Sequence, residues 1–186
     1  MASLQAAQKG TGKGAGPAPV HLWNPPFCGD LDMQIKRDGT WFYQGTPIGR
    51  PGLVKLFSNI LKLEAGKYYL VTPVEKVGIT VEDAPFVAVD FEVSGLGEHQ
   101  DLQFETQVGD KVTAGPEHPL RFMRDAETEE PSPYVMIRAG LEALIDRKSF
   151  YRLVELGVHR PHKGQDWFGL WSGGAFFPVI PSAELT

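Results

Sequence analysis

The chain has 186 residues and a formal net charge of -5, with 42% hydrophobic and 22% charged residues. These proportions are typical of a globular protein and exclude a chain that is disordered throughout. The acidic balance argues against a nucleic-acid partner, because binding to phosphates depends on clustered Lys and Arg. No apolar run reaches the roughly 18 residues needed to cross a bilayer. We therefore expect a soluble protein with no membrane partner.

Cys28 is the only cysteine, which excludes a disulfide within the chain. The N-terminus also lacks the apolar core of a secretory signal. A single free thiol is typical of proteins in a reducing compartment, so the cytoplasm is the expected location.

Residues 1–19 contain almost nothing to bury, which predicts a flexible tail. Within it, residues 10–16 look like a phosphate-binding loop. However, Gly14 occupies the position where Ser or Thr must bind magnesium, and Ala7 replaces the first glycine. No apolar strand precedes the segment either. The flexible tail is the better interpretation, and we expect no cofactor.

The Asp-Gly pair at 38–39 is a strong hairpin signal between predicted strands at 33–35 and 41–44. A helix is predicted next, because Pro51 suits an early helical position and apolar residues recur at spacings of three and four. These apolar residues are Leu53, Leu56, Phe57 and Ile60. We expect Gly66 to end this helix.

Apolar residues, in several stretches alternating with polar ones, predict the strands that follow. They cover residues 67–72, 77–81, 86–93, 102–106 and 121–123. The segment 125–133 is acidic and contains prolines. It is predicted to be a solvated loop.

A second hairpin and helix are predicted after this loop. The hairpin strands are 134–137 and 141–145, with a turn near Gly140. Asp146 is a good N-cap for the helix, and Gly157 can end it. The apolar face of the helix is Phe150, Leu153 and Val154, and the closing strands are 167–171 and 175–179.

The two halves share a short repeated pattern. Ile48-Gly49-Arg50 returns as Ile145-Asp146-Arg147 with the same spacing to the apolar residues that follow. Upstream, Arg37 and Arg138 each stand two residues before a turn glycine, although the second copy reaches its isoleucine four residues sooner. The pattern indicates two related structural units.

Strands outnumber helices and most are joined by short turns, so the sheets should be largely antiparallel. We predict an α+β protein with two small domains at residues 20–83 and 84–186. Each domain should be a mostly antiparallel sheet with one helix, and the two should share a hairpin–helix–strand motif.

Several segments together resemble a bacterial family of unknown function that is numbered twelve-eighty-five. They lie at 35–50 with an Asp-Gly-x-Trp core, 81–86, 108–110, 118–120 and 134–157. The most specific part is the Gly-Leu-Glu-Ala-Leu-Ile-Asp-Arg block that begins at Gly140. The resemblance implies a two-domain α+β protein with a repeated motif and no assigned catalytic residues. It also implies a role in ligand binding or signal transduction.

The repeated arginines are the first candidate site. Arg50 and Arg147 each stand at the start of a predicted helix, where the macrodipole disfavours a cation by about 0.3 to 1 kcal/mol. A helix N-terminus with an arginine can bind an anion. Alternatively, each arginine pairs with an internal acid, and Arg37 and Arg138 carry the same two interpretations. The possible acidic partners are Asp38, Glu82, Asp83 and Asp90.

Other candidate constellations are incomplete. His118 could act as a general base, but no nucleophile is placed beside it in the sequence. His159 and His162 lack further ligands for a metal and are predicted to lie in a surface loop. Ser172 resembles a hydrolase nucleophile, yet Leu170 stands where the sharp turn needs glycine. No metal site and no catalytic residue are expected.

Trp41, Tyr43, Trp167 and Trp171 could line an aromatic pocket. Aromatic residues in strands are more often core, and Lys and Arg do not interleave with them as a single-strand platform requires.

The leading functional hypothesis is a non-enzymatic cytoplasmic module that binds a small anionic ligand or a protein partner between its two halves. Its candidate ligand-binding residues are Arg50, Arg147, Arg37, Arg138, Trp41 and His118. One alternative is a hydrolase-like enzyme that uses His118 with a carboxylate. The other is a structural protein that oligomerises, and the sequence does not determine the oligomeric state.

Overall fold

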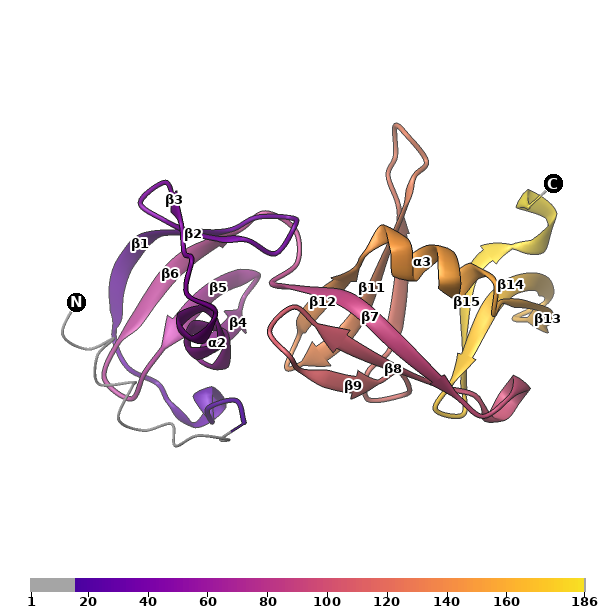
Figure 1. The fold of residues 1–186 in the computed structure, drawn as a ribbon, viewed down its shortest axis with the longest axis horizontal. Coiled ribbons are helices and arrows are strands. Elements are labelled where there is room, and N and C mark those ends of the chain that lie inside the picture. Colours follow the sequence, from indigo (N-terminus) through magenta and orange to yellow (C-terminus); the bar gives the residue numbers. More distant parts are fainter. Residues whose placement is uncertain (1–15, 186) are drawn as a thin grey trace. The chain divides into compact units, whose positions relative to one another are not determined.

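The computed structural model describes residues 16–185, which Figure 1 shows as a ribbon. The chain divides into two compact units after Pro85. We describe them separately as the N-terminal and C-terminal domains. The predicted tail falls largely on residues 1–15, outside the described part of the chain. At its described end, the Ala18 N–H donates to the Asn59 carbonyl oxygen at 3.0 Å.

Among residues 16–185, no helix has the length and apolar character needed to traverse a membrane.

The N-terminal domain is one six-stranded sheet in the order β3-β2-β1-β6-β5-β4. Its elements are η1 (Val20–Leu22), β1 (Phe27–Ile35), β2 (Trp41–Tyr43), β3 (Thr46–Pro47), α2 (Pro51–Asn59), β4 (Leu61–Glu64), β5 (Lys67–Val71) and β6 (Lys76–Val81). Every pairing is antiparallel except that of β1 with β6. This parallel pair joins the first hairpin to the three strands after the helix.

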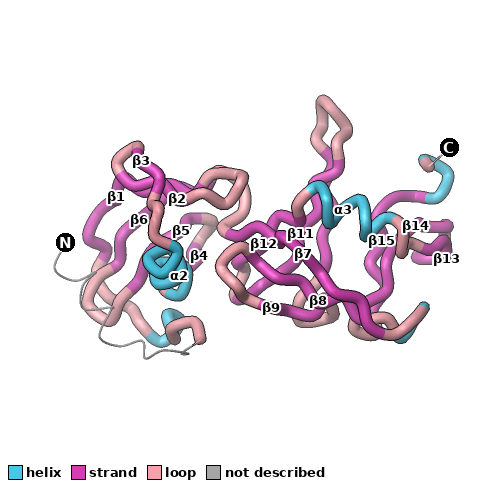
Figure 2. Tube along the Cα trace, viewed as in Figure 1, coloured by secondary structure: helices cyan, strands magenta, loops and turns pink. Residues whose placement is uncertain are grey.

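The C-terminal domain contains a six-stranded sheet, β10-β11-β12-β7-β8-β9, and a three-stranded sheet, β13-β14-β15. Its elements are β7 (Phe86–Ser94), η2 (Gly97–His99), β8 (Asp101–Thr106), β9 (Lys111–Thr113), β10 (Leu120–Arg124), β11 (Pro131–Arg138), β12 (Leu141–Ile145), α3 (Arg147–Val154), β13 (Val158–His162), β14 (Gln165–Ser172), β15 (Ala175–Pro181) and η3 (Ser182–Glu184). Only β12 and β7 pair in parallel. Figure 2 shows that strands dominate both domains, which confirms the predicted α+β class.

The repeated motif is present in both domains, but its second copy is shorter for a visible reason. After β2, Gln44 and Gly45 adopt φ angles of 49° and 77°, and β3 then pairs back on β2. In the second copy β12 runs directly into Asp146, the N-cap of α3. The four extra residues of the first copy are thus the small hairpin at 44–47.

The two copies are also completed differently. In the N-terminal domain, β4 and β5 follow the helix and join the sheet of the hairpin. In the C-terminal domain, β13, β14 and β15 follow the helix and form a sheet of their own. The predicted return strand therefore exists in both domains, but only the first returns to the same sheet.

The prediction that Gly66 ends the first helix is wrong, because α2 ends at Asn59. Leu61 is buried and starts β4, which pairs with β5. Ala65 and Gly66 have φ angles of 50° and 77° and form the turn between these strands. The short strand lies directly after the apolar stripe of the helix, so its apolar residues appeared to extend that stripe.

The segment with His159 and His162 is also not a loop. It forms β13, an edge strand of the three-stranded sheet. Pro161 is compatible with this place, because an edge strand has one side on which a missing N–H costs no hydrogen bond.

Helix α3 is fixed at both ends. Asp146 accepts a hydrogen bond from the Ser149 N–H at 2.8 Å, which confirms the predicted N-cap. Near its other end, Arg152 donates to the Phe91 carbonyl oxygen at 3.0 Å and lies 4.4 Å from the centre of the Phe91 ring. Leu153 is fully buried. The helix is therefore held against β7.

The small sheet is attached to the large one through the end of β14. Ser172 is fully buried, and its hydroxyl donates to the Ala114 carbonyl oxygen at 2.7 Å. The oxygen of the Ser172 hydroxyl also accepts a hydrogen bond from the Leu102 N–H at 2.9 Å. One hydroxyl thus pairs with a backbone donor on β8 and with a backbone acceptor in the segment after β9.

Neighbouring contacts continue this attachment. Gln100 donates from its side-chain amide to the Trp171 carbonyl oxygen at 2.9 Å. The Gly173 N–H donates to the Asp101 carboxylate at 3.1 Å. Gly173 packs so closely that an added Cβ would lie 2.7 Å from the Ala114 carbonyl oxygen. Backbone atoms cannot move aside as a flexible side chain can, so this position requires glycine.

The N-cap of α3 yields a stability prediction. Asp146→Ala removes the acceptor of the Ser149 N–H and should lower the free energy of unfolding by about 1 kcal/mol. Asp146→Asn keeps a side-chain oxygen and should lose much less. Urea unfolding followed by NMR signals of the C-terminal domain checks both variants. Equal losses would contradict a capping role.

The close approach at Gly173 yields a second prediction. Gly173→Ala and Gly174→Ala both place a side chain at positive φ, 57° and 75°, which costs about 1–2 kcal/mol. Only Gly173→Ala also meets backbone atoms, and overpacking adds about 1–3 kcal/mol. Unfolding in urea should show the larger loss for Gly173→Ala. Indistinguishable midpoints would show that the two sheets do not constrain each other here.

Candidate functional site

Arg50 and Arg147 lie at helix starts, as predicted. Arg50 is the N-cap of α2 and Arg147 is the first residue of α3. Both are exposed. Within residues 16–185, neither side chain makes an ion pair with an acid. The internal partners suggested by the sequence are therefore not used by these two arginines.

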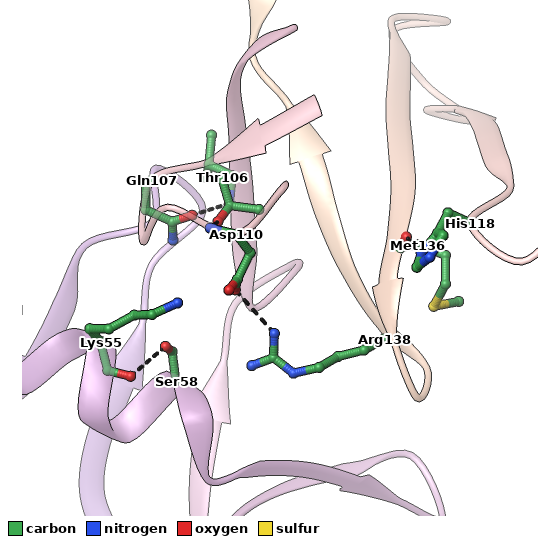
Figure 3. Close-up of polar contacts among 9 residues, drawn as sticks. Lys55, Ser58, Thr106, Gln107, Asp110, His118, Met136 and Arg138 are labelled. Atoms are coloured by element: carbon green, nitrogen blue, oxygen red, sulfur yellow. Dashed lines mark hydrogen bonds and ion pairs between the residues drawn. The ribbon is translucent and has the colours of Figure 1, made fainter. Parts of the chain in front are cut away.

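Arg37 and Arg138 do pair with acids. Arg37 follows β1 and pairs with Asp83 after β6, and its backbone N–H donates to the Glu82 carboxylate at 2.8 Å. Arg138 ends β11 and donates to Asp110 at 3.0 Å, as Figure 3 shows. Both pairs connect strand ends within one domain, which supports a structural role for these two arginines.

The Arg138 pair is the more enclosed of the two. Its side chains are only 20% and 15% exposed. The Arg138 guanidinium also lies 5.0 Å from the centre of the Phe86 ring. Asp110 is held in turn by hydrogen bonds between its backbone and Thr106. The arginine therefore sits in a fixed setting rather than at an open surface.

His118 and Trp41 are part of the framework. The His118 Nδ1 lies 2.9 Å from the Met136 carbonyl oxygen (Figure 3), and its backbone bonds to Gly115. No carboxylate bonds its ring among the residues described. Trp41 is 1% exposed and stacks on Phe57 at 6.1 Å. The structure thus does not bring the six predicted ligand-binding residues together within either domain.

The hydrolase-like serine is structural as well. Ser172 is buried and its hydroxyl is occupied on both sides by backbone groups. Across residues 16–185, no three His, Cys, Asp or Glu side chains are grouped to hold a metal ion.

An open groove in the C-terminal domain was not foreseen from the sequence. It has a volume of about 640 Å³ and lies between β10, α3 and the small sheet. Its apolar walls are Phe122, Met123, Pro131, Phe150, Val154, Trp167, Phe168, Pro178, Val179, Ile180, Pro181 and Leu185. This volume falls in the range of about 300–1,000 Å³ that is typical of ligand sites.

Two walls of the groove come from the predicted apolar face of the second helix and from the predicted strand at 121–123. On α3, Leu153 is the only apolar side chain that is fully buried, whereas Phe150 and Val154 line the groove and Val154 is 38% exposed. On β10, Met123 is 50% exposed. Solvent-facing apolar side chains of this size around one concavity mark an interaction site more often than isolated ones do.

The rim of the groove is acidic. Glu129 and Glu184 line it, together with Arg124, which is paired with Glu184 at 2.8 Å. Glu129 belongs to the exposed turn between β10 and β11. That turn also carries Asp125, Glu127 and Glu130. Carboxylates therefore outnumber cations at this edge.

Both sheets present an edge strand to the groove. β10 is the first strand of the large sheet and β15 the last of the small one. Phe122 and Arg124 of β10 face Pro133 and Pro131 of β11. Proline has no N–H, so these are the non-hydrogen-bonded pairs of the antiparallel ladder. The backbone N–H and C=O groups of Phe122 and Arg124 consequently point away from β11, towards the side of β10 on which no strand pairs with it.

Comparison with family models identifies the chain. Residues 18–84 match the model described as "Domain of unknown function (DUF1285), N-terminal domain". Residues 85–179 match "Protein of unknown function (DUF1285), C-terminal domain". The chain belongs to the DUF1285 family. The resemblance seen in the sequence is thereby confirmed.

Two solved structures of DUF1285 proteins are similar to this chain. One, from Silicibacter pomeroyi, has 63% sequence identity and a TM-score of 0.88, and the match covers 98% of this chain and 97% of the other. The second, from Shewanella baltica, has 30% identity and a TM-score of 0.52, with 67% of this chain and 91% of the other covered. Comparison with curated proteins gives no match.

Two carboxyl groups of this DUF1285 protein have altered acidity. Hydrogen bonding from the Arg152 guanidinium, followed by the Phe91 N–H, holds the pKa of Asp90 below its ordinary value. The Thr40 N–H lowers the pKa of Asp38 in the hairpin turn. Both acids therefore serve local structure, the first by holding α3 and the second by shaping a turn.

The Asp90 pair yields a pH prediction. A folded-state pKa below the unfolded value means that the stabilisation is present above the unfolded pKa and is lost as pH falls through the folded pKa. NMR titration should give Asp90 a midpoint below that of an ordinary Asp, and Arg152→Gln should raise it. Arg124→Gln, which alters another paired arginine, should leave it unchanged. An unaltered midpoint in Arg152→Gln would assign the shift to another cause.

Proposed function

We propose that this DUF1285 protein is a non-enzymatic cytoplasmic binding module that docks an apolar segment of a protein partner in the groove of its C-terminal domain. The observation that carries the proposal is the groove itself, with apolar walls from β10, α3 and the small sheet. Partner-free proteins rarely leave so many large apolar side chains around one concavity.

The charge around the groove supports a particular class of partner. Glu129 lies on the rim, and the turn that carries it is acidic and exposed. The whole chain is acidic as well, with a net charge of -5. Complementary charge speeds encounter and selects between partners. The partner segment should therefore combine apolar residues with Lys or Arg.

The strand edge supports an extended form of that segment. Phe122 and Arg124 direct backbone groups away from β11, so a partner strand can add hydrogen bonds there while its alternate side chains enter the groove. β15 is less suitable, because Pro178 and Pro181 remove two N–H groups. We place the main-chain pairing on β10.

We also propose the signalling or regulatory role that the family resemblance implies, with partner docking as its basis. Docking a partner segment is one way in which a module without catalytic residues acts in regulation. Anion binding at Arg50 and Arg147 also remains a proposal, supported by their exposure and helix-start positions.

A displayed library of short random peptides tests the docking proposal. Peptides with alternating apolar residues and flanking Lys or Arg should be enriched on the wild-type protein. Met123→Lys places a cation in the groove and should weaken their binding by at least about tenfold, or about 1.4 kcal/mol. Leu96→Lys makes the same charge change at an 87% exposed leucine outside the groove, and should leave binding intact.

Three results would overturn the proposal. Enrichment that Met123→Lys and Leu96→Lys reduce equally would locate binding elsewhere. Enrichment of acidic peptides would contradict the charge argument. A concentration-dependent dimer that Met123→Lys abolishes would make the occupant a second copy of the chain, as the structural alternative predicts.

A further inference from the structure

A second feature of the C-terminal domain is independent of the groove. Arg160 lies on β13, half-buried, on a small sheet rich in aromatic residues. Its guanidinium carbon is 4.6 Å from the centre of the Trp171 ring and 5.2 Å from that of Phe176. The two rings meet edge to face at 5.5 Å. The guanidinium therefore occupies a corner made by two aromatic rings.

The register of the sheet explains why these groups meet. Arg160 pairs with Trp167, and residues at every second position of β14 share that face. Gly169 lies on this face, and the Phe176 ring packs over it, since an added Cβ would lie 2.5 Å from that ring. The absence of a side chain at Gly169 thus allows Phe176 to stand beside the arginine.

Arg160 differs from most of the other arginines of the chain. Five of them, namely Arg37, Arg121, Arg124, Arg138 and Arg152, pair with carboxylates. Arg160 has no acidic partner within the described part of the chain. Asp166 is opposite Pro161 and so belongs to the other face of the sheet. The stacked guanidinium keeps its in-plane N–H donors available.

The imidazole of His162 lies near Arg160 on the same strand. His162 is two residues further along β13 and shares the face of Arg160. Its ring is 5.8 Å from that of Phe176, so Phe176 contacts both side chains. Arg160 and His162 can therefore approach one ligand from the same side of the edge strand.

We propose that Arg160, held in the corner formed by Trp171 and Phe176, binds the phosphate group of a small ligand together with His162. A guanidinium offers a planar fork of donors that matches two phosphate oxygens, and stacking fixes its plane in advance. Lysine carries the same charge without the fork or the stacking. None of these four residues lines the groove, and the proposal does not depend on the proposed function.

NMR titration with inorganic phosphate, AMP and acetate at constant ionic strength tests this site. The Arg160 Nε–H and Trp171 indole signals should shift saturably with phosphate and AMP, and more weakly with acetate, which carries fewer oxygens. Tighter binding of AMP would identify phosphate monoesters as the natural source, whereas equal affinity would identify free phosphate.

Substitutions of Arg160 separate the effect of the planar guanidinium donors from that of the positive charge alone. Arg160→Gln should abolish saturation, and Arg160→Lys should weaken binding by at least about tenfold. Arg121→Gln removes an arginine of the same domain that pairs with Glu142 and does not line the groove, and it should leave the affinity unchanged. Unchanged melting temperatures would show that the variants fold. Shifts that rise linearly without saturation, or full affinity in Arg160→Lys, would overturn the proposal.

Discussion

The position of the small sheet in the C-terminal domain depends on the buried hydroxyl of Ser172. This hydroxyl accepts from the Leu102 N–H and donates to the Ala114 carbonyl oxygen, so neither backbone group is left unpaired in the interior. Leaving such a group unsatisfied costs about 1–3 kcal/mol. Leu102 lies on β8 of the large sheet and Ala114 directly follows β9 of that sheet, whereas Ser172 ends β14 of the small sheet. The two hydrogen bonds therefore fix the small sheet against the large one. Gly173 permits the close approach that makes them possible.

The groove follows from this attachment. Its walls come from β10, α3 and the small sheet, and a small sheet that moved freely would not hold them at one separation.

Comparison of the two copies of the repeat explains why the helix face is left uncovered. In the N-terminal domain the strands after the helix complete one sheet. In the C-terminal domain they leave it, and the apolar face of α3 is then only partly covered, with Leu153 buried and Val154 exposed.

This difference explains which parts of the fold the sequence could predict. The hairpin strand 141–145 and the Asp146 cap depend on neighbouring residues, and both are as predicted. Strand β13 was missed because it contains Pro161, which is compatible only with an edge strand. The end of α2 was missed because it depends on the pairing of β4 with β5. The groove was not predicted because it depends on packing between segments that are distant in the sequence. Phe150, Leu153 and Val154 are equivalent in an apolar pattern, and only the placement of the small sheet separates core from surface.

Charge distribution raises a further constraint on function. An acidic chain does not repel anions at every point of its surface, because salt limits the range over which exposed charges interact to about 8–10 Å at physiological ionic strength. Most arginines here are neutralised by carboxylates that hold strand ends or α3. Arg160 is held by rings instead, which fix its position without cancelling its charge. An acidic rim on the groove and an uncancelled guanidinium on β13 can thus coexist in one domain, as the two proposed sites require.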